Sequence, residues 1–372
     1  MLVGVPKEIK DNEYRVGLAP ESVREVIAHG HNVIVETNAG GGIGASDDEY
    51  RKAGAEIVGD AADVFATAEM IVKVKEPQAV ERAMLREGQI LYTYLHLAPD
   101  PEQTKDLVNS GAICIAYETV TSPHGGLPLL RPMSEVAGRM SIQAAAHSLE
   151  KTHGGIGMLL GGVPGVDPSK VVVIGGGVVG THAAHIAVGM GADVWVLDRS
   201  NDSLERLWRH FGRSINTVYS TRDAIERHVI EADVVIGGVL IPGAAAPKLV
   251  TAEHVSAMKP GAVMVDVAID QGGCFETSHA TTHSDPTYVV DDVVHYCVAN
   301  MPGGVPRTST FALNNATLAG CLALADKGYK RALADDVHLR NGLNVHCGDI
   351  TYKEVADDLG YDYVEPMAAM AK

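Results

Sequence analysis

The chain has 372 residues, more than one hydrophobic core usually holds, so its length predicts two domains. Hydrophobic residues make up 46% and charged residues 21%, a balance typical of folded globular proteins that excludes long disorder. The formal net charge of −17, without a local basic patch, disfavours nucleic acid and anionic membranes as partners.

Cysteine usage and the N-terminus indicate the compartment. The five cysteines lie far apart in the sequence and their number is odd, which favours reduced thiols over a disulfide framework. The segment Met1–Glu8 becomes charged at Lys7, so it lacks the apolar core of a signal peptide and is typical of a first strand. No apolar run approaches the roughly 18 residues needed to cross a bilayer. We therefore expect a cytoplasmic protein.

Up to about residue 130, short apolar runs alternate with charged helical stretches. A helix is predicted over 20–27, and Gly30 marks its end. The predicted strands of this region are 2–5, 32–36, 70–75, 89–96 and 112–117. This alternation predicts parallel pairing in an α/β domain.

The proline-containing segment Leu127–Pro132 interrupts the pattern, and a long helix is predicted from Ser134. We place the domain boundary here, after residue 130. A second α/β series follows, with strands predicted over 171–174, 192–197, 233–239 and 262–268 and helices over 203–211 and 252–258. A helical region over 309–328 then leads away, and its periodicity leaves open whether it extends the second domain or returns to the first.

The segment Gly175–Gly180 has the G-x-G-x-x-G spacing of a dinucleotide-binding turn. In a chain with 40 glycines this spacing alone is weak evidence. Here it lies between a predicted buried strand, 170–174, and a helix that continues from Thr181, which disfavours a glycine-rich loop that binds nothing. Gly175 permits the tight turn, Gly177 lets the backbone approach a pyrophosphate, and Gly180 lets helix and strand pack closely. The helix N-terminus then faces the phosphate charge.

Asp198 ends the next predicted strand, eighteen positions after Gly180. A carboxylate there can accept hydrogen bonds from ribose hydroxyls and would repel a 2′-phosphate. The adjacent Arg199 tempers this argument. We predict NAD as the cofactor.

Further motifs extend over nearly the whole chain: Val3–Glu8 with Arg15–Val16, Val72–Pro77, Tyr94–Leu97, Pro132–Arg139 and Val265–Gly273. As an ordered set they closely resemble the alanine dehydrogenase family, within the superfamily that includes the NAD-binding transhydrogenase component. The resemblance implies an α/β fold of two Rossmann-like domains with parallel sheets. It also implies a discontinuous substrate domain, 1–130 plus 307–372, and an NAD-binding domain, 131–306.

The same resemblance implies reversible, NAD-dependent oxidative deamination of L-alanine to pyruvate and ammonium by a homo-oligomer, commonly a hexamer. A rival reading is a transhydrogenase component, which passes hydride to a partner domain, and another is a non-catalytic NAD-binding protein. The set Arg15, Lys75, His96 and Asp270 disfavours both. Physiological direction, tolerance for other small amino acids and subunit number are not written in the sequence.

Arg15, Lys75 and His96 match family positions for substrate chemistry. The planar fork of Arg15 could bind the substrate carboxylate in a bidentate pair, although on its own it is typical of a surface arginine. Lys75 and His96 close two predicted strands, and active-site groups of parallel sheets gather at such ends. Lys75 would hold the carboxylate or carbonyl oxygen. His96, with an ordinary pKa of about 6.5, would act as acid and base, whereas a lone histidine is more often structural.

Asp270 lies just past the predicted strand 262–268, beside Gly272 and Gly273. It could polarise the attacking water or stabilise the iminium, and its alternative is an ordinary turn-capping aspartate. Which of His96 and Asp270 takes the decisive proton stays open.

The resemblance assigns further residues to the cofactor, with backbone contacts dominating at the apolar ones. The predicted cofactor-binding residues are Ser134, Gly175, Gly177, Val178, Val179, Gly180, Asp198, Ser220, Val239, Leu240, Val267, Ala268, Ile269, Asp270, Val298, Ala299, Asn300 and Met301. His279 stands where some relatives carry an arginine near the cofactor, which puts a phosphate contact there in doubt. Bound magnesium would fit the resemblance, but no clustered ligand motif supports it, so no metal site is predicted.

Overall fold

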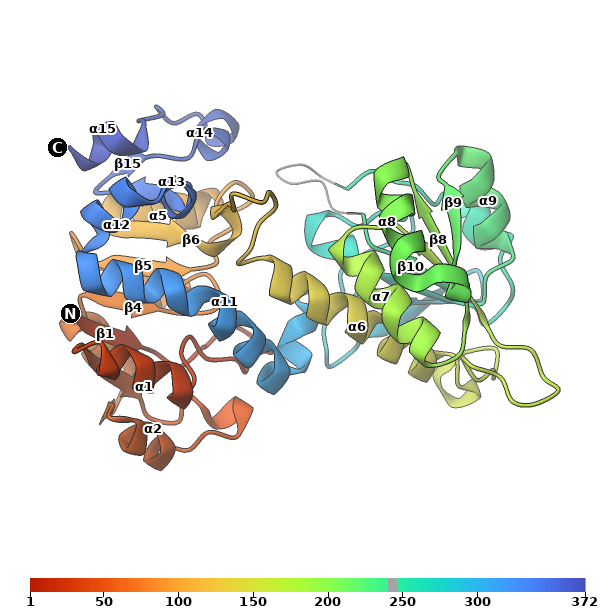
Figure 1. The fold of residues 1–372 in the computed structure, drawn as a ribbon, viewed down its shortest axis with the longest axis horizontal. Coiled ribbons are helices and arrows are strands. Elements are labelled where there is room, and N and C mark those ends of the chain that lie inside the picture. The colour runs from red at the N-terminus through yellow and green to blue at the C-terminus, as the bar shows by residue number, and fades with distance from the viewer. Residues whose placement is uncertain (240–245, 372) are drawn as a thin grey trace. The chain divides into compact units, whose positions relative to one another are not determined.

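The computed structural model describes residues 1–239 and 246–371, and these fall into two compact units. Unit 1 comprises residues 1–133 and the chain from Gly303 onwards, and unit 2 comprises residues 134–302. The divisions lie after Met133 and Pro302, where the sequence placed them after residues 130 and 306. Figure 1 shows the red, orange and blue elements of unit 1 around one sheet, so this unit is built from both ends of the described chain. Within the described residues, no helix combines the length and apolarity that crossing a bilayer requires.

An eight-stranded sheet, in the order β15-β14-β6-β5-β4-β1-β2-β3, lies at the centre of unit 1. Its strands are β1 (Leu2–Val5), β2 (Asn32–Glu36), β3 (Glu56–Val58), β4 (Met70–Val72), β5 (Ile90–Thr93), β6 (Ile113–Ala116), β14 (Leu343–His346) and β15 (Asp349–Ile350). The first six pair in parallel, as predicted, whereas β14 runs antiparallel to β6 and to β15. Only Cys347 and Gly348 separate β14 from β15, and such a short connection permits only an antiparallel pair.

Helices surround this sheet. The longest of them shows whether the chain after the second domain extends that domain or returns to the first, which the sequence left open. They are α1 (Pro20–Ala28), α2 (Asp47–Ala53), α3 (Ala61–Thr67), α4 (Ala79–Arg82), α5 (Pro101–Ser110), α11 (Pro306–Lys327), α12 (Tyr329–Asp335), α13 (Val337–Arg340), α14 (Lys353–Leu359) and α15 (Pro366–Met370). The Ala19 N–H donates to Asn314 Oδ1 of α11 (2.7 Å), and Asn314 Nδ2 donates to Gly17 O (3.0 Å). The chain beyond residue 303 therefore returns to the first unit.

Unit 2 has a seven-stranded sheet in the order β12-β13-β11-β10-β7-β8-β9. Its elements are α6 (Arg131–Ser148), β7 (Lys170–Ile174), α7 (Val178–Gly189), β8 (Asp193–Asp198), α8 (Asn201–Phe211), β9 (Asn216–Tyr219), α9 (Arg222–Ile230), β10 (Val234–Gly237), α10 (Ala252–Ser256), β11 (Val263–Asp266), β12 (Thr287–Val290) and β13 (Val293–Tyr296). All pairs are parallel except β12 with β13. Read from β9 towards β13, this is the strand order of the Rossmann fold, whose direction of winding reverses between β7 and β10.

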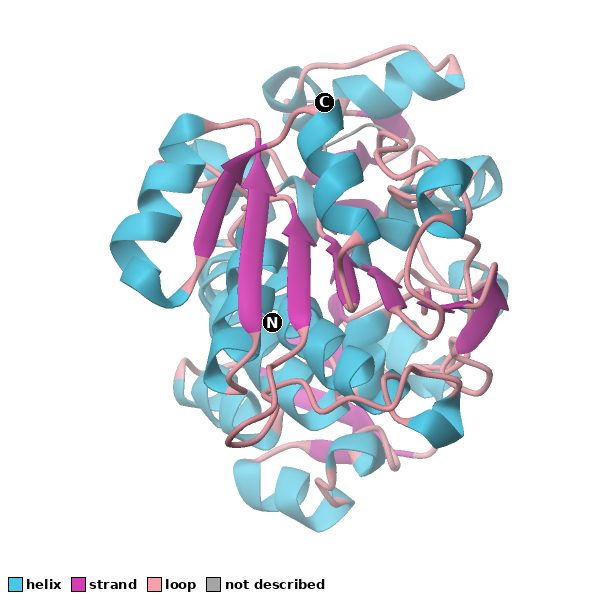
Figure 2. Ribbon diagram, turned by 90° about the vertical axis from the view of Figure 1, so that its right-hand side faces the viewer, coloured by secondary structure: helices cyan, strands magenta, loops and turns pink. Residues whose placement is uncertain are grey.

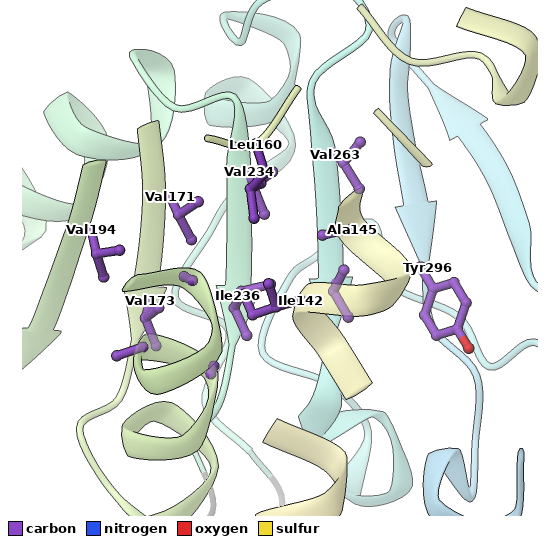
Figure 3. Packing of buried hydrophobic residues seen from close by; sticks show 14 of the residues in the cluster. Ile142, Ala145, Leu160, Val171, Val173, Val194, Val234, Ile236, Val263 and Tyr296 are labelled. Atoms are coloured by element: carbon purple, nitrogen blue, oxygen red, sulfur yellow. The ribbon is translucent and has the colours of Figure 1, made fainter. Parts of the chain in front are cut away.

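Helices cover both faces of the unit 2 sheet (Figure 2), so its strands are buried on both sides. Val171 and Val173 of β7 pack in one hydrophobic cluster, and the alternate residues Val172 and Ile174 pack in another. Figure 3 shows Ile142 and Ala145 of α6 against the first face. This double burial explains why β7 is a continuous apolar run in the sequence.

Strands β4 and β5 end at Val72 and Thr93, each three residues earlier than predicted. The chain keeps some pairing beyond these ends, because Lys73 N donates to Tyr92 O (3.2 Å) and Tyr94 N to Val74 O (3.2 Å). His96, however, has a φ of +51°, which no strand residue adopts. Lys75 and His96 therefore lie in loops rather than at strand ends.

Candidate active site

Three predicted residues come together at one edge of the unit 1 sheet. Strands β1, β4, β5 and β6 are consecutive neighbours and parallel, so the loops that follow them lie along the same carboxyl edge. Arg15 follows β1, Lys75 follows β4 and His96 follows β5. The fourth, Asp270, belongs to unit 2.

Arg15 is buried, with 2% of its surface exposed, so its interpretation as a surface arginine is wrong. Its Nε and Nη2 donate to the two carboxylate oxygens of Glu13 at 2.6 and 2.5 Å, and Nη1 lies 3.0 Å from the sulfur of Met133. Burial opposes the charge, but Glu13 outweighs burial and raises the pKa of Arg15 above its ordinary value. One side of the guanidinium is thus engaged within the protein.

A pocket of about 420 Å³ opens beside Arg15. Residues 7–15 line it together with Asn38, Ala39 and Gly42. Lys75 and His96 do not belong to this lining, so among the described residues the pocket marks the Arg15 end of the edge only.

The Lys75 loop is held from below by a buried ionic group. Lys73 is fully buried, and its Nζ donates to Glu8 (3.1 Å) and Glu81 (2.7 Å). The other oxygen of Glu8 accepts the N–H groups of Val74 (2.7 Å) and Lys75 (3.4 Å). Burial raises the pKa of Glu8, although Lys73 and the Val74 N–H oppose this rise.

The side chain of Lys75 is 14% exposed. Its Nζ is 4.0 Å from Glu76, which also pairs with Lys10. Burial would raise the pKa of Glu76, but Lys75 and Lys10 outweigh it and hold that pKa below its usual value. Lys75 is therefore a charged, partly accessible donor on an anchored loop.

Glu118 organises the backbone of the His96 loop. Its carboxylate accepts the N–H of His96 at 2.6 Å and the N–H of Leu95 at 3.2 Å, which stabilises the left-handed backbone of His96. The same carboxylate lies 3.9 Å from His96 Nδ1, and the imidazole stacks on Tyr94 with the ring planes 6° apart. The side chain of His96 is 44% exposed. An oriented, accessible imidazole is suited to proton transfer.

In unit 2 the turn between β7 and α7 has the geometry that the glycine spacing predicts. Gly175 adopts a φ of +101°, and a Cβ at Gly180 would lie 1.8 Å from Gly175 O. A Cβ at Gly177 would meet no heavy atom within 4 Å, so space is open where α7 begins. Gly177 also brings no side chain to cap the first amides of α7. These residues fit a diphosphate at the helix N-terminus.

Asp198, at the end of β8, already bonds to the turn. Its Oδ2 accepts the Gly176 N–H at 2.6 Å, and its Oδ1 accepts the Ser200 N–H at 2.7 Å. Arg206 of α8 donates from Nη2 to Gly176 O at 2.7 Å. A carboxylate thus binds the N–H of Gly176 and a guanidinium binds its carbonyl oxygen.

Asp266, at the end of β11, holds the loop that carries Asp270. It is fully buried and accepts hydrogen bonds from Cys274 N (2.9 Å), Phe275 N (3.2 Å) and the Ser278 hydroxyl (2.6 Å). Burial raises the pKa of Asp266, against these hydrogen bonds. Asp270 lies in the 3-10 turn Val267–Gln271 that follows.

Asp270 Oδ1 accepts the N–H of Asn300 at 3.2 Å, and Asn300 has a φ of +59°. This bond joins two predicted cofactor segments, 267–270 after β11 and 298–301 after β13. Two other predicted residues follow parallel strands of the same sheet, Ser220 after β9 and Val239 after β10. They share the carboxyl edge of one sheet with the glycine turn.

Three positions need separate mention. Leu240, also predicted to bind the cofactor, lies outside the described residues. Ser134 is in α6, where a Cβ at Gly138 would lie 2.3 Å from Val179 O, so that α6 and α7 approach closely. His279 stacks on Tyr288 with ring centres 3.6 Å apart.

Sequence reasoning missed the side chains that hold these loops in place. They are Glu8, Glu13, Glu118, Arg206 and Asp266. Glu8 and Asp266 lay within motifs that carried the family resemblance, but their charges gave no sign of burial. The others carried no local signal, because their partners are known only once the fold is known.

Two family profiles together match most of the chain. The "Alanine dehydrogenase/PNT, N-terminal domain" profile matches residues 4–137, and the "Alanine dehydrogenase/PNT, C-terminal domain" profile matches residues 141–353.

Similar proteins of full length carry the same description. Those named alanine dehydrogenase from Halomonas elongata and Bacillus subtilis are 61% and 55% identical, and each alignment covers 98% or more of both chains. A solved structure titled L-alanine dehydrogenase superposes with a TM-score of 0.94 at 51% identity, covering 97% of this chain and 99% of that one. A transhydrogenase structure from Sinorhizobium meliloti superposes with a TM-score of 0.81 at 27% identity, covering 95% of this chain and 99% of that one.

Proposed function

The chain belongs to the alanine dehydrogenase/PNT family and is an amino-acid dehydrogenase of the alanine dehydrogenase type, and from this premise we propose how its residues share the reaction. The reaction is L-alanine + NAD⁺ + H₂O → pyruvate + NH₄⁺ + NADH + H⁺, and it is reversible. The observation that carries the assignment of roles is the convergence of Arg15, Lys75 and His96 on one carboxyl edge in unit 1.

In unit 1, two cations recognise the substrate. Arg15 and Lys75 bind its carboxylate, and Lys75 also reaches the carbonyl oxygen of pyruvate. Arg15 acts here with one side of its guanidinium tied to Glu13, so its position does not depend on substrate. His96 exchanges protons with the substrate nitrogen and with water. Its backbone bond to Glu118 keeps the imidazole in place while the proton moves.

In unit 2, the glycine turn and α7 bind the dinucleotide diphosphate, and Asp198 accepts hydrogen bonds from ribose hydroxyls. Held by these residues, NAD⁺ would supply the acceptor for the hydride of the substrate α-carbon. Both Asp198 oxygens already accept backbone N–H groups, and each oxygen retains a second lone pair for a hydroxyl.

Asp270 supplies a second acid-base group. It polarises the attacking water or stabilises the iminium, and its bond to the Asn300 N–H fixes its position. The decisive proton goes to His96 or to Asp270, and this choice stays open.

We also propose a homo-oligomer, with a hexamer as the state that the family resemblance implies. Unit 2 exposes apolar side chains on the segment 159–166, where Leu159, Val163 and Val166 are 68%, 51% and 62% exposed. Such a patch suits contact with a second copy of the chain. Light scattering after size-exclusion chromatography measures the state, and a monomer at all concentrations would contradict it.

The direct test is NADH absorbance with purified protein, L-alanine and NAD⁺ across a broad pH range. We expect a rise in absorbance, and its absence at every pH would refute the proposed activity. Repeating the assay with NADP⁺ tests Asp198, because a greater efficiency with NADP⁺ would contradict its role. The transhydrogenase structure makes hydride exchange between dinucleotides the alternative, and that activity without alanine turnover would favour it.

A further inference from the structure

The end of α6 carries a cluster of ligand-type side chains that the proposed reaction does not use. His147, Glu150 and His153 place one ligand atom each within 4.8 Å of one another. Within the part of the chain that the structure describes, this is the one such group of three or more histidine, cysteine, aspartate or glutamate side chains. The cluster therefore calls for its own explanation.

Its spacing follows from the local backbone. Glu150 N donates to His147 O (3.2 Å), and His153 N donates to Glu150 O (3.0 Å), which makes two successive 3-10 turns. Glu150 has an extended backbone (φ −65°, ψ 142°), so the chain changes direction between the two turns, and the three side chains gather at this corner. The sequence analysis found no clustered ligand motif and predicted no metal site, and the proximity of these three side chains becomes visible only in the structure.

The backbone beneath the cluster is held by the core. Leu149 is fully buried in the cluster that packs on the unit 2 sheet. Gly154 adopts a φ of +89°, and a Cβ at Gly155 would lie 2.3 Å from Ser148 O. The three side chains therefore start from a fixed base, which lowers the entropy cost of gathering them around a ligand.

We propose that His147, Glu150 and His153 bind a divalent transition-metal ion such as Zn²⁺. Glu150 oxygens lie 3.7 Å from His147 Nδ1 and 3.4 Å from His153 Nδ1. Bonds of about 2.0–2.2 Å to a tetrahedral ion separate its ligands by about 3.4 Å, so these pairs need little movement.

The donor set selects the class of ion. Two imidazoles and one carboxylate suit Zn²⁺, Ni²⁺ and Cu²⁺, whereas Mg²⁺ and Ca²⁺ prefer oxygen ligands alone. The side chains of His147, Glu150 and His153 are 63%, 56% and 40% exposed, so water completes the coordination. The Thr152 hydroxyl lies 3.5 Å from His153 Nδ1, a long contact that the ion replaces.

The test is calorimetric titration of metal-free, full-length protein with Zn²⁺. We expect one ion per chain, and affinity falling about tenfold or more in His153→Gln and in Glu150→Gln. His124→Gln removes another exposed histidine and is the matched control, which keeps wild-type affinity. No binding by the wild type, or equal binding by all four proteins, would overturn the proposal.

Two further measurements separate ligand loss from misfolding. Without metal, the melting temperatures of the variants should match the wild type, because the replaced side chains are exposed. With Cu²⁺, electron paramagnetic resonance should show two coupled nitrogens in the wild type and one in His153→Gln. An unchanged nitrogen count in that variant would place the ion elsewhere and refute the assignment.

Discussion

In unit 1 charged side chains line the carboxyl edge of the sheet, whereas in unit 2 glycine and backbone line much of the corresponding edge. Lys73, Glu8 and Glu81 form a buried ionic group in the first, and Arg15 pairs with Glu13. In the second, Gly175 and Gly180 are required by backbone geometry. Two sheets of the same class thus prepare different chemistry: charges for a small polar substrate, and backbone for a large dinucleotide.

The largest expected effect is on the stability of the charged edge. Lys73→Met leaves the carboxylates of Glu8 and Glu81 buried without their cation, which costs about 3–5 kcal/mol of unfolding free energy. Urea unfolding at neutral pH measures it. Lys353→Met is the control, because Lys353 also pairs with a carboxylate, that of Asp357, but is exposed, so a similar loss there would contradict the comparison.

The same group makes stability depend on alkaline pH. Burial would lower the pKa of Lys73, but Glu8 and Glu81 raise it above the ordinary 10.5. A raised pKa in the folded state gives stability that is complete below pH 10.5 and is lost as pH rises through the folded value. The wild type should therefore lose more stability than Lys73→Met in thermal melts above pH 10.5. Equal losses would show that other groups dominate.

The next effect is on catalysis alone. Lys75→Ala should lower kcat/KM by about 10²–10³-fold, because a cation that faces the reacting oxygens is removed. NADH binding, followed by fluorescence titration, should stay nearly intact, since the dinucleotide is assigned to unit 2. Lys52→Ala removes an exposed lysine of α2 and is the control. Lost NADH binding in Lys75→Ala, or an equal rate loss in Lys52→Ala, would mark Lys75 as structural.

Gly180→Ala is the matching experiment on the backbone edge. Its Cβ would displace Gly175 O, a strain of about 1–3 kcal/mol, so NADH should bind roughly tenfold to a hundredfold more weakly. Gly189→Ala lies in the same helix, where a Cβ meets nothing within 4 Å. Fluorescence titration of both variants decides the point, and equal affinities would show that the turn tolerates a side chain.

The smallest effect concerns the support of His96. Glu118→Ala leaves two N–H groups without their acceptor and should lower kcat about tenfold with NADH affinity unchanged. Glu118→Gln keeps an acceptor oxygen and should retain most of the activity. Steady-state rates of both variants test this, and equal losses would contradict the anchoring role.

The glycine and backbone edge of unit 2 could be predicted from the sequence more fully than the charged edge of unit 1. The glycine turn is a local pattern, so strand, turn and helix were predicted together with the function of Gly175, Gly177 and Gly180. Arg15 was predicted as a substrate ligand only through the resemblance, and its burial could not be predicted because it depends on contacts from distant parts of the chain, such as Met133. Glu8 meets Val74 across 66 positions, and Glu118 meets His96 across 22. Such pairs become visible only when the sheet order is known.

Strand lengths failed for a related reason. Buried residues continue beyond the true strand ends, with Lys73 and Val74 after β4 and Tyr94 and Leu95 after β5. The hydrophobic pattern of a sequence indicates which residues are buried, and here burial continues beyond the end of the hydrogen-bonded strand pairing. The presence of a histidine in a largely apolar run does not predict the left-handed backbone that His96 adopts.

Because the chain returns from unit 2 to β14, the strands of unit 1 are not synthesised in one continuous stretch. Strand β6 leaves the ribosome long before β14, its neighbour in the sheet. At about 5–20 residues per second, the wait is on the order of 10–45 s. During that interval unit 2, which is continuous in sequence, can fold completely, while the nascent first unit presents an unpaired strand edge to the cell. Protection of that edge by a chaperone would matter most in this window.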